Sequence, residues 1–130
     1  MIAKTAEYID KLKEDATIVA QADCLLSFAT VARQYSYTKP TITSGAKITI
    51  KQGRHPVIEQ SLPSGEEYVA NDVYLDPDTQ QICIITGPNM SGKSAYLRQT
   101  ALITLMAQVG AYVPARFAEI GVVDRIFTRV

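Results

Sequence analysis

The most constraining feature of the sequence is a glycine-rich segment between an apolar run and a helical pattern. It reads Gly87-Pro88-Asn89-Met90-Ser91-Gly92-Lys93-Ser94, in which four residues separate the first glycine from Gly-Lys-Ser. Glycines let the backbone turn so that successive N–H groups face inward. The positive end of the following helix dipole adds to this field. The segment therefore predicts a phosphate-binding loop (P-loop) that binds a nucleoside triphosphate.

Individual residues of this loop have predicted roles. We expect Lys93 to reach the β and γ phosphates, and the Ser94 hydroxyl to ligate Mg²⁺. In many P-loops the next residue is Thr or Ser, whose side chain helps to hold the α-phosphate. Here that residue is Ala95, so we expect the backbone N–H alone to make this contact. Asn89 either contacts the γ-phosphate or the attacking water, or is simply a turn-former.

The segments around the loop predict a strand before it and a helix after it. Residues 81–86 are apolar and β-branched, as in a strand covered on both faces. Residues 95–109 have apolar side chains around more than half of a helix, which predicts a mostly buried helix with a left-handed cap at Gly110. We expect short strands at 112–113 and 126–127.

The first part of the chain predicts a long helix and then a sheet of short strands. Residues 3–36 contain neither proline nor glycine and have an apolar stripe at helical spacing, which predicts one helix, or two that meet near Ala22 and end before Pro40. Strands are predicted at 48–50, 68–70 and 73–75, as an antiparallel sheet. Loops or turns are predicted at 52–56 and 61–65, with a short apolar step at 57–58. The predicted division is 1–40 for the helix and 41–130 for the P-loop domain.

Composition indicates a soluble globular domain. The 130 residues are 47% hydrophobic and 20% charged, and 13 basic residues balance 13 acidic ones. This neutrality favours neither nucleic acid nor a membrane surface as a direct partner. We see no apolar stretch long enough to span a bilayer and no signal peptide, which predicts a cytoplasmic protein. Cys24 and Cys83 are expected to be reduced, partly buried thiols, because no CxxC spacing surrounds them.

The loop and its flanks resemble the ATPase domain of the bacterial MutS family of DNA mismatch-repair proteins. The resemblance covers residues 48–130, through 86–103 around the loop, 108–115 and 120–129 after it, and 53–59 and 70–71 before it. The helix at the start is similar, more weakly, to the long helix that leads into that domain.

The resemblance implies a fold, cofactors and partners. It implies an incomplete ABC-type P-loop ATPase domain of the α/β class, binding ATP and Mg²⁺ in a homodimeric parent protein. That parent binds mismatched DNA through other domains, switches clamp states with ATP, acts on the bacterial nucleoid and meets downstream repair proteins. The family's acidic Asp-Glu pair would follow Val130, so we expect no catalytic residue within this chain and no ATP turnover by it.

Other single residues leave alternatives open. The resemblance assigns Tyr68 to stacking on the adenine ring, although an aromatic packed in the core would look the same. His55 fits a structural hydrogen-bonding role better than a catalytic one. Arg98, Arg125 and Arg129 could act as arginine fingers, and Arg98 fits a solvent-facing position better. Two further functions are a recombination-related ABC-type ATPase and a non-enzymatic dimerisation module.

Overall fold

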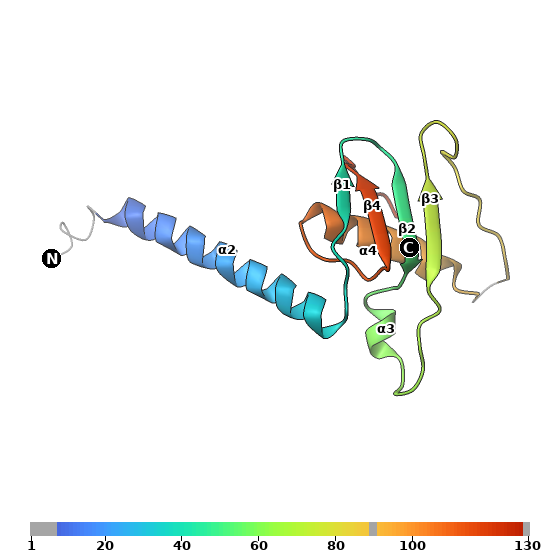
Figure 1. Cartoon of the computed structure of the whole chain (residues 1–130), viewed down its shortest axis with the longest axis horizontal. Helices are drawn as coiled ribbons and strands as arrows, with labels where there is room; N and C mark the ends of the chain where they lie inside the picture. Colours follow the sequence, from blue (N-terminus) through green and yellow to red (C-terminus); the bar gives the residue numbers. More distant parts are fainter. Residues whose placement is uncertain (1–7, 89–90, 129–130) are drawn as a thin grey trace.

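One continuous helix forms the N-terminal part of the computed structural model, which describes residues 8–88 and 91–128. This helix, α2 (Ile9–Gln34), extends away from the rest of the chain (Figure 1). It ends where Ser36 adopts a φ of 53° and the Tyr37 N–H donates to the Ala32 carbonyl at 2.9 Å. This left-handed cap stops the helix before Pro40 is reached. The predicted helix is thus confirmed over Ile9–Gln34 as a single one, without a break at Ala22, and residues 3–7 of the prediction lie outside the described residues.

The apolar stripe of α2 is uncovered. Among the described helix residues only Ala32 is buried, and Leu12, Val19 and Leu26 are 55%, 67% and 66% exposed. The helix also reaches a mean hydropathy of 1.2 over 18 residues, which meets the length and composition of a membrane span. The expectation that no such stretch exists is therefore wrong. The apolar residues of α2 lie between scattered charges, so no continuous apolar run marks the stretch in the sequence. One such helix is only a weak indication of a membrane.

Four strands form a mixed sheet in the order β1-β4-β2-β3. They are β1 (Thr41–Thr43), β2 (Ile48–Gly53), β3 (Asn71–Leu75) and β4 (Phe117–Gly121). β2 pairs antiparallel with β3 and with β4, whereas β1 pairs parallel with β4. The predicted antiparallel sheet is confirmed at 48–50 and 73–75. The last strand of the chain lies between the first two, so the sheet depends on contacts between distant residues.

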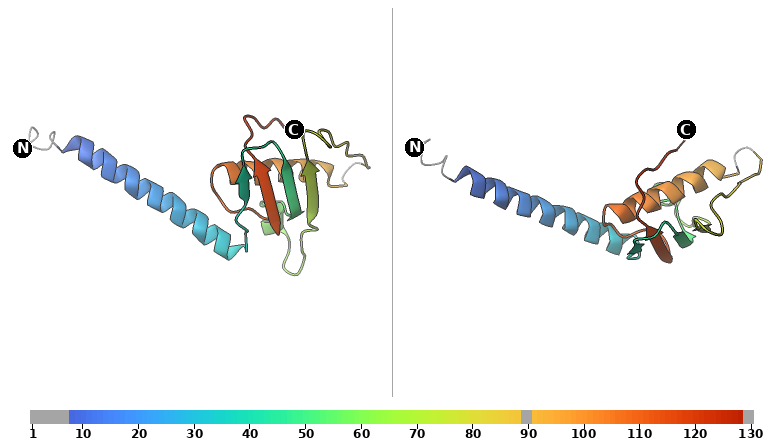
Figure 2. Two further views of the ribbon diagram at one scale, coloured as in Figure 1. Left: turned by 45° about the horizontal axis from the view of Figure 1, so that its top comes forward. Right: turned by 90° about the horizontal axis from the view of Figure 1, so that it is seen from above.

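Helix α4 (Lys93–Gln108) packs on one face of this sheet (Figure 2). Ile50, Val73, Ala118 and Ile120 point from the sheet into a core that also contains Ile103 and Ala107 of the helix. The helix ends in a Schellman motif, in which the N–H groups of Gly110 and Ala111 donate to the carbonyls of Ala107 and Met106. Gly110 has a φ of 85°, which confirms the predicted cap.

Several predicted features are absent from the described residues. Residues 68–70 are not a strand. The pairing of β3 with β2 stops at the pair Asn71–Gly53, so β3 begins at Asn71. Residues 81–86 have no partner strand, and Ile82 and Ile84 are 79% and 84% exposed. An apolar run becomes a covered strand only where neighbours exist on both sides.

The end of the chain and α4 also differ from prediction. Val113 forms only an isolated bridge with Thr38, and 126–127 form no strand. Helix α4 is buried on one face only, since Leu97 and Leu105 are 57% and 50% exposed. The sequence also gave no indication of β1 or β4, and the predicted step at 57–58 is the start of the short helix α3 (Ile58–Ser61).

Candidate functional site

The glycine-rich loop leads directly into α4. Gly87 and Gly92 have positive φ angles of 152° and 84°, which glycine adopts without the penalty that a Cβ would bring. Helix α4 begins at Lys93, so its first free N–H groups lie at the end of the loop. Asn89 and Met90 lie outside the described residues, and the predicted roles of both stay predictions.

The Lys93 ammonium is held against the loop. Its Nζ donates to the Gly87 carbonyl and, at 3.1 Å, to the Pro88 carbonyl. An ammonium has three donors, and these two bonds within the described residues use two of them. The charge of Lys93 therefore lies at the loop before any anion binds.

A cavity of about 540 Å³ lies beside the loop, which is within the size range of small-molecule sites. Part of its lining comes from residues 58–71 and is apolar apart from Glu67 and Asn71, and part comes from the loop and the start of α4. The apolar lining comes from Ile58, Leu62, Tyr68 and Val69, and the loop side comes from Thr86, Ser91, Gly92, Lys93 and Ala95. Tyr68 and Lys93, which are far apart in the sequence, thus line one cavity.

Hydrogen bonds from two tyrosines join the walls of this cavity. The Tyr68 hydroxyl donates to Gln99 Oε1 at 3.0 Å, and the Tyr96 hydroxyl donates to the Asp72 carbonyl at 2.9 Å. Burial raises the pKa of Tyr68, and the negative charge of Glu59 raises it further. Burial likewise raises the pKa of Tyr96, so both phenols keep their protons and act as donors at neutral pH.

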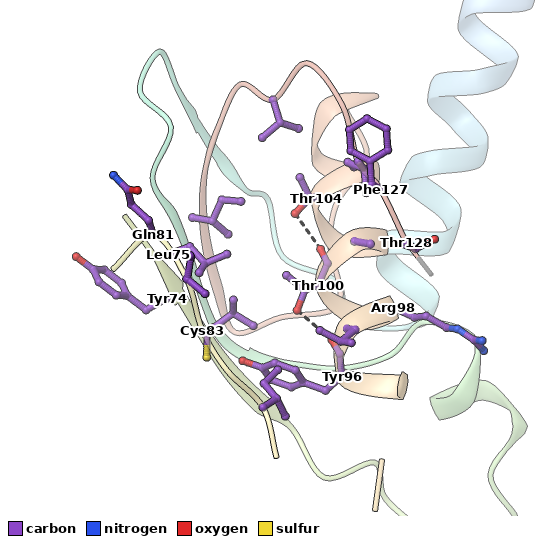
Figure 3. A pocket seen from close by; sticks show the side chains of 18 of the residues that line it. Tyr74, Leu75, Gln81, Cys83, Tyr96, Arg98, Thr100, Thr104, Phe127 and Thr128 are labelled. Carbon is purple, nitrogen blue, oxygen red and sulfur yellow. Dashed lines mark hydrogen bonds between the residues drawn. The ribbon is translucent and has the colours of Figure 1, made fainter. Parts of the chain in front are cut away.

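A second, larger cavity of about 760 Å³ lies between α4, the end of β3 and the C-terminal segment (Figure 3). Its lining is largely apolar and includes Leu75, Cys83 and Phe127. Ser94, the predicted Mg²⁺ ligand, lines this cavity and not the one that contains Lys93. We take the smaller cavity as the candidate site, because it alone combines the loop, the lysine and the tyrosine.

The remaining candidate residues lie elsewhere. His55 is buried, and its Nδ1 accepts hydrogen bonds from the N–H groups of Val57 and Ile58, both at 3.3 Å, which is the structural role expected for it. Arg98 is exposed and is one of the residues that line the larger cavity (Figure 3). Arg125 is exposed, and Arg129 lies outside the described residues.

Neither cysteine lines the smaller cavity. Cys24 and Cys83 are free thiols, as predicted, but both are exposed, so the expected partial burial is wrong. Both lie in segments, α2 and 81–86, whose apolar side chains are largely exposed in the described part of the chain. Within residues 8–88 and 91–128 no group of three or more His, Cys, Asp or Glu could hold a metal ion.

Sequence reasoning missed Gln99, which is fully buried behind the site and bonded to Tyr68. A signal for it existed: Gln99, Ile103 and Ala107 are spaced by four and form the buried row of α4. A polar residue in such a row needs a hydrogen-bonding partner. The sequence does not show that the partner is Tyr68.

Comparison with known proteins identifies the class of protein to which this fold and site belong. Residues 83–130 match the family model of MutS domain V, the ATPase domain. The chain is 58% identical over its whole length to a DNA mismatch repair protein MutS of Phocaeicola vulgatus and 61% identical to one of Christiangramia forsetii. A MutS protein of Cytophaga hutchinsonii is 63% identical over 117 residues, which are 90% of this chain and 14% of that protein.

All three relatives carry the same name, DNA mismatch repair protein MutS. The chain belongs to the MutS family, as the resemblance implied. It spans about 15% of the length of the first two relatives. The matches give no support to a recombination-related ATPase or to a dimerisation module.

Proposed function

We propose that this chain binds ATP in the smaller cavity, with the phosphates at the glycine-rich loop and the adenine at the apolar end. The observation that carries the proposal is the shared lining of that cavity by Lys93 and Tyr68. A nucleotide has a flat apolar base at one end and a polyanion at the other. The cavity offers apolar side chains and Tyr68 for the base, and the loop and Lys93 for the phosphates. Ser94 lines the larger cavity, so its hydroxyl would ligate Mg²⁺ only after turning toward the phosphates at the loop.

Within the parent protein, the segment would serve as the nucleotide-binding part of an ATPase that acts in DNA mismatch repair. The names of the relatives support this role. Contacts with mismatched DNA, dimer formation, clamp switching and downstream repair proteins would involve parts of the parent outside this chain. Its net charge of zero fits a segment that does not bind DNA by itself. A soluble, cytoplasmic location follows from the same role.

Thermal denaturation with and without Mg·ATP tests the nucleotide site. A ligand at 100 times its dissociation constant stabilises the folded chain by about 2.7 kcal/mol. We expect a clear rise in melting temperature for the unaltered chain, and none for Lys93→Ala. Lys39→Ala is the matched control, since Lys39 is exposed and does not line either cavity. Equal shifts for all three proteins would contradict the proposal.

Hydrolysis is a separate question. It requires a carboxylate that holds Mg²⁺ and a group that orients water, and the resemblance places the acidic pair after Val130. We therefore expect the 130-residue chain to bind ATP without turning it over. A steady-state phosphate-release assay checks this, and turnover that Lys93→Ala abolishes would show that the chain is catalytically sufficient.

A further inference from the structure

Gln99 is the most deeply buried polar side chain near the candidate site. It lies on α4, is 0% exposed, and follows Lys93 on the same helix. Its Oε1 accepts a hydrogen bond from the Tyr68 hydroxyl at 3.0 Å and a longer one, at 3.5 Å, from Asn71 Nδ2. Gln99 therefore connects the helix that carries Lys93 with the segment that carries Tyr68.

The other end of the same amide is closely packed and unsatisfied. Gln99 Nε2 has no hydrogen-bond partner among the described residues, and it lies 2.8 Å from where a Cβ would be at Gly53. An unpartnered buried amide group costs free energy, so an apolar side chain of similar size would serve packing better. The value of a glutamine at this position must come from its Oε1 and the two donors that reach it.

Tyr68 needs such support because its own segment has no regular structure. Residues 66–70 belong to neither helix nor strand, so no backbone ladder holds them in place. The hydroxyl bond to Gln99 is the side-chain hydrogen bond that Tyr68 makes within the described part of the chain. Asn71, at the start of β3, adds a second link through its donation to the Val69 carbonyl at 2.9 Å.

We propose that Gln99 is a positioning residue, which holds the Tyr68 ring at the apolar end of the cavity at a fixed place relative to Lys93. The inference rests on the proposed function. It predicts that the loss of Gln99 weakens recognition of the base and leaves recognition of the phosphates intact, because Gln99 touches the site only through Tyr68 and Asn71.

The test compares two ligands, Mg·ATP and Mg·tripolyphosphate, by isothermal titration of the 130-residue chain. One hydrogen bond is worth about 1 kcal/mol, or about fivefold in affinity. We expect Gln99→Leu to weaken ATP about fivefold and tripolyphosphate not at all. Tyr68→Phe keeps the ring and removes the hydroxyl, so it should weaken ATP by a similar factor. The double variant should be no weaker than either single variant, because both remove the same bond.

The outcomes separate this inference from the proposed function. If the unaltered chain binds neither ligand, the proposed function is wrong and the role of Gln99 is refuted with it. If both ligands bind and Gln99→Leu weakens them equally, or weakens neither, only the positioning role is refuted. Should Gln99→Leu fail to fold by circular dichroism, Tyr68→Phe alone decides, and an unchanged ATP affinity for that variant would overturn the inference.

Discussion

Gly121 is the position where a single added methyl group should do the most harm. It is the last residue of β4, and its N–H donates to the Lys47 carbonyl at 2.7 Å. A Cβ at this position would collide with the Gly45 carbonyl oxygen and would lie 2.7 Å from the Gly45 carbonyl carbon and 2.8 Å from the Ala46 Cα. These atoms belong to the backbone and cannot rotate aside.

The expected cost follows from that geometry. Overpacking of a filled site costs about 1–3 kcal/mol, and an immobile backbone neighbour places Gly121→Ala at about 3 kcal/mol. For a domain of this size, that loss lowers the melting temperature by roughly 11 °C. Gly45→Ala is the matched control, because a Cβ on Gly45 meets nothing within 4 Å.

Thermal denaturation followed by circular dichroism measures both variants. Gly45→Ala should melt close to the unaltered chain or slightly above it, since alanine reduces the freedom of the unfolded state. A Gly121→Ala variant that melts as high as Gly45→Ala would refute the close packing of β4 against the loop at Gly45 and Ala46.

Two further predictions concern the polar groups beside the site. Arg54 Nε and Glu59 Oε2 form an ion pair at 2.6 Å, with side chains that are 26% and 14% exposed. Arg54→Ala leaves the carboxylate unpaired, so it should lower the free energy of unfolding by about 2 kcal/mol in urea denaturation. Glu59→Gln should cost less, and equal costs for the two variants would contradict the argument. Burial lowers the pKa of His55 below its usual 6.5, so the unfolded chain takes up a proton that the folded chain resists. Stability should therefore fall as the pH drops from about 7 to about 5.5, which is above the pH range in which carboxylates titrate. If the stability of His55→Asn falls equally steeply over this range, His55 is excluded as the cause.

Local patterns predicted the parts of the fold that depend on neighbouring residues. The stripe of α2, the helix after the loop and its glycine cap, and the alternation at 48–50 all follow from short-range periodicity. β1 and β4 could not be found in this way, because Thr41–Thr43 is a strand only through pairing with Glu119–Gly121. Conversely, the run at 81–86 has the composition of a covered strand and lacks neighbours.

The candidate site was predictable to a similar extent. The loop pattern indicated Lys93 and its neighbours, and the family resemblance indicated Tyr68. The contribution of Gln99 depends on how residues 68 and 99 meet in three dimensions, and no sequence spacing encodes that meeting. The separation of Ser94 from Lys93 into different cavities also depends on which way the first turn of α4 faces the sheet.

The strand order has a consequence for how the chain acquires its structure during synthesis. β1 is made before β2 and β3, but its sheet neighbour β4 is made after both of them. The ribosome must therefore release nearly the whole segment before β1 can be fixed, whereas β2 and β3 can associate earlier as a hairpin-like pair. Limited proteolysis of a chain that stops at Arg116 checks this. Cleavage should concentrate around 38–46 and spare 48–75, and protection of both regions would show that β1 finds its place without β4.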